Sequence, residues 1–239
     1  MKSSNGCCNS QHLKTNHMRT FSKTDLLALV LLAVPLVYLA AVYNTLPARV
    51  PMHFNIQGTP DRYGSKTELL IVLCILTGVA AGVYALCRWL PSIDPKKTAK
   101  YSADVARKIA LAVLLLVVAV SVMVIYSAQH GSSGNITRLL PFLLGGLFVF
   151  LGNLMNSLKP NYFIGIRTPW TLESEPTWRK THRFGAVVFV IGGILLIVCG
   201  LVLPPAAATI CIVCISVAVS VLTIGYSYFY YRSLQKQQP

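Results

Sequence analysis

Six long apolar runs constrain this 239-residue chain more than any other feature. They cover roughly residues 25–46, 68–90, 107–126, 138–157, 184–203 and 206–230. As α-helices rising 1.5 Å per residue, such runs are long enough to cross the roughly 30 Å hydrocarbon core of a bilayer. Charged residues make up only 12% of the chain, whereas soluble domains have about a quarter. The sequence therefore predicts an all-α fold, a polytopic membrane bundle of six transmembrane helices.

The distribution of basic residues predicts the orientation of this bundle. If the N-terminus lies inside, the cytoplasmic segments hold 17 of the 21 Lys and Arg residues, and the outer segments hold four. Because Lys and Arg concentrate in cytoplasmic loops, both termini are expected in the cytoplasm. The net charge of +14 then reflects topology and anionic lipid, so the expected partner is the lipid bilayer, without direct nucleic-acid binding.

The same pattern divides the chain into segments. The expected order is a polar, disordered cytoplasmic tail (1–23), a first helix pair (24–90) with an outer loop (46–67), a basic cytoplasmic loop (91–106), a four-helix region (107–231) with an inner loop (158–183), and a cytoplasmic tail (232–239). None of the seven cysteines falls in a predicted outer loop, so no disulfide framework is expected.

The outer loop has too many prolines and glycines for a helix. Residues 49–54 are expected to be extended, with a turn at 58–61 and a short hairpin as one solution. His53 and Asp61 have three interpretations: a metal or acid–base pair, a folded cap with His53 bonded to backbone, or part of a surface that recognises an extracellular peptide. The recognition candidates are Pro47, Pro51, His53, Phe54, Gly58, Pro60, Asp61 and Lys66.

The inner loop combines aromatic, basic and small residues. Asn161–Trp170 is expected to be extended, Gly165 allows close packing, and Ser174 has the character of a helix N-cap. Two Asn residues before it should point into the bundle or toward the loop, because an unpaired amide in lipid is costly. The candidates, for binding or as a structural brace, are Asn153, Asn156, Asn161, Gly165, Arg167, Thr168, Pro169, Trp170, Thr171, Trp178, Thr181 and His182.

These two loops carry a family resemblance. The inner run from Asn161 to Leu172, followed by Trp178–Arg183, resembles the signature of the SdpI family of bacterial multipass membrane proteins. The outer run from Leu46 to Lys66 resembles a small domain of unknown function often found N-terminal to it. The resemblance implies a bacterial cytoplasmic membrane protein that gives immunity to a membrane-active extracellular peptide toxin. It also implies signal transduction, in which the occupied protein holds a cytoplasmic transcriptional repressor at the membrane.

Two other classes of function stay open at this point. A small-solute transporter or channel would need polar groups near the bilayer midplane, but no apolar run has a charge in its middle. A membrane enzyme using His182 and Arg167 would need partners, and the seven acidic residues form no convincing pair. The chain is therefore expected not to be an enzyme and to have neither a cofactor nor a metal site.

Overall fold

The computed structural model describes residues 21–93, 103–131 and 136–236. Most of the predicted N-terminal tail, most of the basic loop 91–106 and the last three residues of the chain lie outside these ranges. Within them the order is α1 (Lys23–Val42), β1 (Arg49–Phe54), β2 (Pro60–Ser65), α2 (Lys66–Ile93), α3 (Ala103–His130), α4 (Ile136–Met155), α5 (Pro169–Glu173), α6 (Glu175–Val202) and α7 (Pro205–Gln235).

Six of these helices, all except the short α5, are long and apolar enough to cross a membrane. Their apolar residues face outward: Leu201, Val202 and Phe229 are each about 70% exposed. A helix with an apolar exposed surface is stable in hydrocarbon rather than in water. The predicted membrane bundle of six helices is therefore confirmed.

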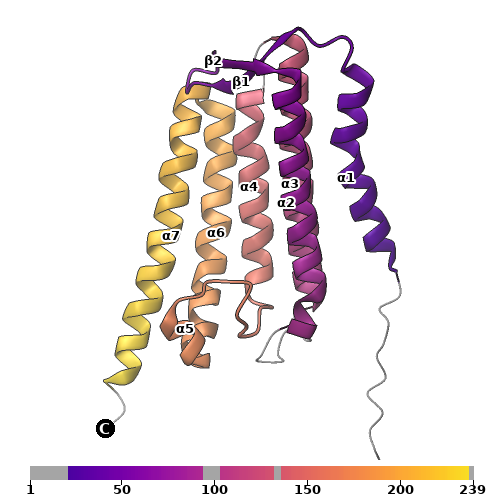
Figure 1. Ribbon diagram of the computed structural model, residues 1–239. Helices are drawn as coiled ribbons and strands as arrows, with labels where there is room; N and C mark the ends of the chain where they lie inside the picture. Colours follow the sequence, from indigo (N-terminus) through magenta and orange to yellow (C-terminus); the bar gives the residue numbers. More distant parts are fainter. Residues whose placement is uncertain (1–20, 94–102, 132–135, 237–239) are drawn as a thin grey trace, which may run out of the picture.

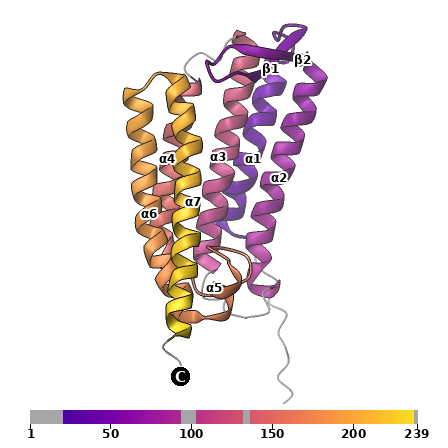
Figure 2. The same ribbon diagram turned by 90° about the vertical axis from the view of Figure 1, so that its left-hand side faces the viewer.

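The helices form two groups that meet along α3 and α4 (Figures 1 and 2). In the first group α3 packs against α1 and α2, and in the second α6 packs against α4 and α7. Near the end that carries α5, Phe163 and Ile164 of the inner loop pack against a core that contains Cys87 and Leu90 of α2 and Ala106 of α3. The inner loop thus joins both groups.

Small residues bring α4 and α6 together. A Cβ atom on Gly145 would lie 2.6 Å from the carbonyl oxygen of Gly193, and one on Gly152 would lie 2.8 Å from that of Ala186. Since both pairs leave no room for a larger side chain, the two backbones approach closely, as is common in membrane helices. By contrast, Cβ atoms on Gly78 and Gly82 of α2, which have Gly-x-x-x-Gly spacing, would meet nothing within 4 Å.

A buried ion pair fixes the first helix at the same end as α5. Asp25, only 5% exposed, pairs with Arg88 of α2 and accepts a 2.8 Å hydrogen bond from the Tyr84 hydroxyl. Ser22 completes the arrangement as the N-cap of α1, in a reciprocal capping box with Asp25. These charges lie at the ends of their spans, so they do not alter the apolar middle of the bundle.

The outer loop is an antiparallel hairpin in which Arg49 pairs with Ser65 and Phe54 with Pro60. Its base is held by Val50, which is buried with Leu69 of α2 and Ile125 of α3. The extended segment 49–54 is thus confirmed. The predicted turn at 58–61 is displaced: Gly58 and Thr59 lie in the reversal, but Pro60 and Asp61 already belong to β2. The chain reverses at residues 55–59 because the Asn55 side chain accepts hydrogen bonds from the backbone of Gln57 and Thr59.

Candidate functional site

The inner loop folds back on itself around Asn161, which is 1% exposed. Its Oδ1 accepts hydrogen bonds from the backbone of Phe163 (2.9 Å) and Ile164 (2.7 Å), and its Nδ2 donates to the carbonyl oxygens of Lys159 (2.9 Å) and Ile164 (3.1 Å). This bonding makes a series of bends in place of the predicted extended chain. The amide acts as a local template for the loop, which periodicity in the sequence does not reveal.

His182 and Trp178, on the buried face of α6, bind the inner loop on both sides of the bend around Asn161. The backbone N–H of Ile166 donates to His182 Nε2 at 3.1 Å, and Trp178 Nε1 donates to the carbonyl oxygen of Leu158 at 2.9 Å. The two rings stack with centroids 4.0 Å apart. Since His182 Nδ1 lies 2.9 Å from the Trp178 carbonyl oxygen, the bonding requires the neutral tautomer protonated at Nδ1.

Gly165 provides the space for this contact. Its φ angle is +115°, which side chains rarely adopt, and a Cβ atom there would overlap His182 Nε2. The predicted close approach at Gly165 is therefore present, and its partner is the imidazole ring.

The second part of the loop starts a helix where the sequence predicts extended chain. Thr168 caps α5, which begins at Pro169, in a reciprocal capping box with Thr171. Trp170 Nε1 donates a 2.7 Å hydrogen bond to Ser227 Oγ of α7, and the indole packs edge-on against Tyr228. Trp170 is thus half-buried against α7, and nothing in the sequence links it to a serine 57 residues away.

The helix signals after Ser174 are confirmed. Ser174 caps α6, its Oγ accepting from the backbone N–H of Thr177 at 3.3 Å, and Arg179 forms an i,i+4 ion pair with Glu175. Trp178 is buried together with Thr181 and His182, which follow it at i+3 and i+4 on one helix face. The Thr181 hydroxyl has no hydrogen-bond partner within the described part of the chain.

A cavity of about 890 Å³ opens beside this network, at the end of the bundle opposite the hairpin. Its charged lining residues are Lys159, Glu173, Glu175, Arg179 and Arg183, and His182 also contributes. Arg167 does not line it: its guanidinium is exposed and donates to the Tyr162 carbonyl oxygen at 2.6 Å. His182 and Arg167 therefore do not line this cavity together, and both imidazole nitrogens are engaged.

Asn153 and Asn156, the two Asn residues before the loop, were expected to point into the bundle or toward the loop. Both are exposed, so neither points into the bundle. Asn153 Nδ2 donates to the Val149 carbonyl oxygen of its own helix at 3.0 Å, which satisfies the amide locally. Asn156 lies just beyond α4 and lines the cavity, so it does point toward the loop.

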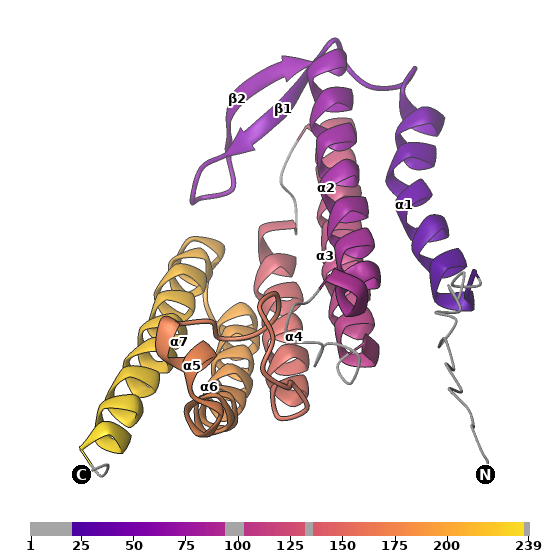
Figure 3. The same ribbon diagram turned by 60° about the horizontal axis from the view of Figure 1, so that its bottom comes forward.

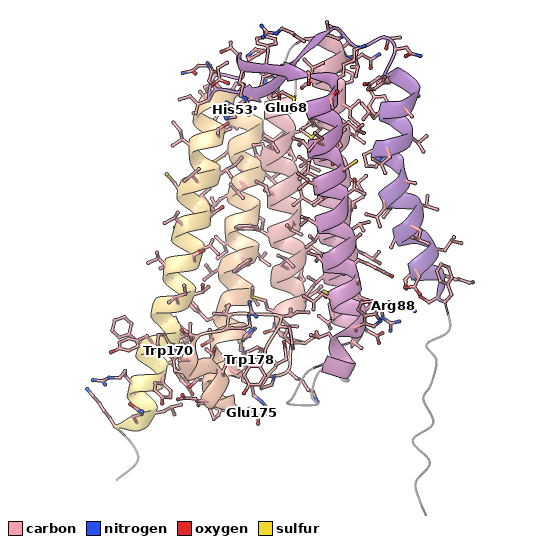
Figure 4. The ribbon with its side chains drawn as sticks, in the orientation of Figure 1. His53, Glu68, Arg88, Trp170, Glu175 and Trp178 are labelled. Carbon is pink, nitrogen blue, oxygen red and sulfur yellow. The ribbon has the colours of Figure 1, made fainter. Side chains whose placement is uncertain are left out.

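The hairpin forms a second candidate site at the opposite end of the molecule (Figure 4). His53 Nδ1 lies 2.6 Å from Asp61 Oδ1, and both side chains are exposed. Of the three interpretations, the one with His53 bonded to backbone differs from the structure, in which the Asp61 carboxylate is the partner of Nδ1. Within the described ranges, no group of three potential metal ligands includes this pair.

Other hairpin candidates have structural contacts. Gly58 has a φ angle of +80° in the turn, and Pro60 pairs with Phe54. Lys66 Nζ donates to the Tyr43 carbonyl oxygen at 3.0 Å, while Arg62 pairs with Glu68. The candidates Pro47 and Pro51 flank the start of β1.

The position of the hairpin is its most distinctive property. It packs on α2 and α3 at its base, but its far end extends over the ends of α6 and α7 (Figures 1 and 3). Ile56 in the turn and Tyr63, which pairs with Pro51 nearer the base, are each about 50% exposed. The hairpin therefore offers an accessible surface beyond the bundle.

The fold and the two opposite sites define a multi-pass membrane protein with a structured loop at each end. Residues 157–229 match the SdpI/YfhL protein family, and residues 30–78 match a domain of unknown function (DUF1648). These matches confirm the resemblance to the SdpI family and to the domain that precedes it. They include most of both loops.

Curated relatives agree with these matches. The chain is 25% identical over 212 residues to "Immunity protein SdpI" of Bacillus subtilis (strain 168), a similarity that covers 89% of this chain and 98% of the relative. It is 44% identical over 54 residues to an uncharacterized protein of Archaeoglobus fulgidus, which covers 22% of this chain and 30% of that protein. No solved structure matches the chain.

Proposed function

We propose that this chain is an integral membrane immunity protein that gives resistance to a membrane-active peptide toxin. The observation that carries the proposal is the similarity to the immunity protein of Bacillus subtilis, which extends over 98% of that protein. A similarity of this extent includes the spans, the hairpin and the inner loop together. The expected location is the bacterial cytoplasmic membrane, with the hairpin outside as the charge distribution predicts.

The hairpin is the proposed point of first contact with the toxin. Ile56 and Tyr63 are exposed apolar side chains on an element that is anchored only at its base. Each strand pairs only with the other in the described sheet, so each has one edge whose backbone groups are available to an extended peptide. Apolar and strand-edge contacts of this kind suit an amphipathic peptide.

The inner loop is the proposed support or output element. Its buried hydrogen bonds favour a brace that joins both helix groups through Phe163 and Ile164. The neighbouring cavity, with Lys159, Arg179 and Arg183, supports a further role in holding a cytoplasmic repressor. Such signalling requires two states that the toxin binds unequally. Both His182 ring nitrogens bond to backbone groups, so they give no support to the enzyme hypothesis.

Survival and membrane depolarisation test this proposal. A toxin-sensitive bacterium would express the full chain, an Ile56→Ser/Tyr63→Ser variant, Arg167→Ala, or the control Val213→Ser, which alters a lipid-facing position of α7. Each strain would be exposed to a panel of membrane-active peptides. We expect protection by the wild type and the control, reduced protection by the hairpin variant, and normal membrane levels of all four. Wild-type cells as sensitive as empty-vector cells to every peptide would refute the immunity proposal.

An Arg183→Ala strain tests the cavity proposed to hold the repressor, and Arg167→Ala, outside that cavity, is its inner-loop control. If the inner loop serves output only, Arg183→Ala retains direct protection but does not release repression of a reporter gene. If it loses protection and membrane level together, the loop acts as a brace and the repressor proposal fails. The transporter alternative would require toxin-independent solute uptake into proteoliposomes.

A further inference from the structure

An apolar groove lies between three helices on the side of the bundle. Within the described structure α1 and α4 both pack on α3 but not on each other, which leaves a groove of about 650 Å³. Twelve described residues line it, and Lys108 is the only charged one. Leu27, Leu115 and Phe150, one from each helix, are 48%, 56% and 37% exposed. Each helix therefore leaves an apolar surface in the groove that no other described part of the chain covers.

The groove matches the depth of one lipid leaflet. Along α3 it extends from Lys108, in the second turn, to Leu116. Eight residues of α-helix correspond to about 12 Å, and half of the hydrocarbon core is about 15 Å. Lys108 lies near the start of α3, where the core containing Ala106 packs against Phe163 and Ile164 of the inner loop, and the charge distribution predicts this end of the bundle to be cytoplasmic. The groove therefore fits an acyl chain of the inner leaflet.

The charge at the mouth of the groove selects the headgroup. Lys108 is exposed, and the carboxylate one turn earlier, Asp104, pairs with Arg107 instead. An ammonium group at the headgroup level attracts anionic lipid, which is concentrated in the cytoplasmic leaflet. From this combination we propose that the groove binds an anionic phospholipid of the inner leaflet. Its acyl chain lies along Leu115 and Phe150, and Lys108 binds its phosphate. This site is independent of the immunity proposal.

Two glycines offer a matched pair of variants for testing the groove. Gly146 lines it, and a Cβ atom there would meet nothing within 4 Å, so a larger side chain can enter the groove without a clash. Gly78 of α2 is equally open and lies outside the groove. Leu at each position adds the same apolar volume, but only at Gly146 does it compete with the lipid.

Native mass spectrometry of the full chain in detergent, with phosphatidylglycerol or phosphatidylcholine of identical acyl chains, measures the binding. We expect the wild type to retain one phosphatidylglycerol with a preference of about fivefold, the factor for about 1 kcal/mol from one Lys at an anionic surface. Lys108→Gln should abolish the preference, whereas Lys180→Gln on α6 should keep it. Gly146→Leu should lose both lipids, and Gly78→Leu should resemble the wild type.

Three results would overturn the assignment. Equal binding of both lipids by the wild type would indicate ordinary bulk lipid. An unchanged preference in Lys108→Gln would remove the proposed phosphate ligand. A wild-type dimer that Gly146→Leu converts to monomer would show that a second copy of the chain occupies the groove. If circular dichroism shows that Gly146→Leu is unfolded, the Lys108 comparison alone decides.

Discussion

Replacing Gly165 by Ala tests whether the contact between the inner loop and α6 stabilises the fold. An Ala with positive φ costs roughly 1–2 kcal/mol. The added Cβ also overlaps His182 Nε2, so the ring must move and its hydrogen bond to Ile166 is lost, which costs about 0.5–1.5 kcal/mol. We therefore expect Gly165→Ala to lower the free energy of unfolding by about 2–3 kcal/mol.

Unfolding of the full chain with sodium dodecyl sulfate in mixed micelles, followed by tryptophan fluorescence, measures this change. Two other glycines separate the contributions. Gly131 has a φ angle of +69° with nothing within 4 Å of a Cβ, so Gly131→Ala should cost only the backbone part, about 1 kcal/mol. Gly146 is helical and open, so Gly146→Ala should cost nothing or stabilise slightly.

A double-mutant cycle isolates the steric part. In a His182→Ala background the clash is absent, so Gly165→Ala should cost about 1 kcal/mol less than in the wild type. If Gly165→Ala costs no more than Gly131→Ala, or if the cycle shows no coupling, the imidazole does not constrain the loop and the reasoning is refuted.

Three further changes test other parts of the structure. Asp25→Asn leaves the Arg88 guanidinium without its carboxylate and should lower the free energy of unfolding by about 3 kcal/mol in the same assay; full stability in the single variant would show that the pair is screened. Gly193→Leu places a side chain against the facing backbone of α4, so the folded fraction after purification should fall severely. The control Gly78→Leu, where a Cβ meets nothing within 4 Å, should keep the wild-type folded fraction. In cells with the native cysteines replaced, an impermeant thiol reagent should label Gln57→Cys in intact cells and Leu172→Cys only after lysis; the reverse pattern would overturn the orientation.

Local chemistry explains what could be predicted from the sequence. Ser174 bonds within its own first turn, so the start of α6 follows from neighbouring residues. Gly165 likewise indicates close packing, although not against which atom. The conformation around Asn161 is harder to predict. Its side chain takes the backbone hydrogen bonds of Phe163 and Ile164, which makes an irregular bend without sequence periodicity, whereas an extended loop was predicted.

Contacts between distant residues could not be predicted. Asp25 and Arg88 are 63 residues apart, and Trp170 and Ser227 are 57 apart. Each belongs to a helix or loop whose rotation is set by packing of all its neighbours. In an apolar membrane span many helix faces are equally hydrophobic, so periodicity gives little information about which face turns inward.

The class of protein, the six spans and their predicted orientation follow from the amino-acid sequence, because span length, hydropathy and charge distribution act segment by segment. Three other features are visible only in the assembled bundle: His182 is a neutral partner of the inner loop, the hairpin extends beyond its own helices (Figure 3), and α1 and α4 leave a groove over α3. The sequence cannot fix these features because hydrocarbon solvates every apolar face alike. The choice of partners therefore depends on close backbone approach and buried hydrogen bonds, which exist only once the helices are assembled.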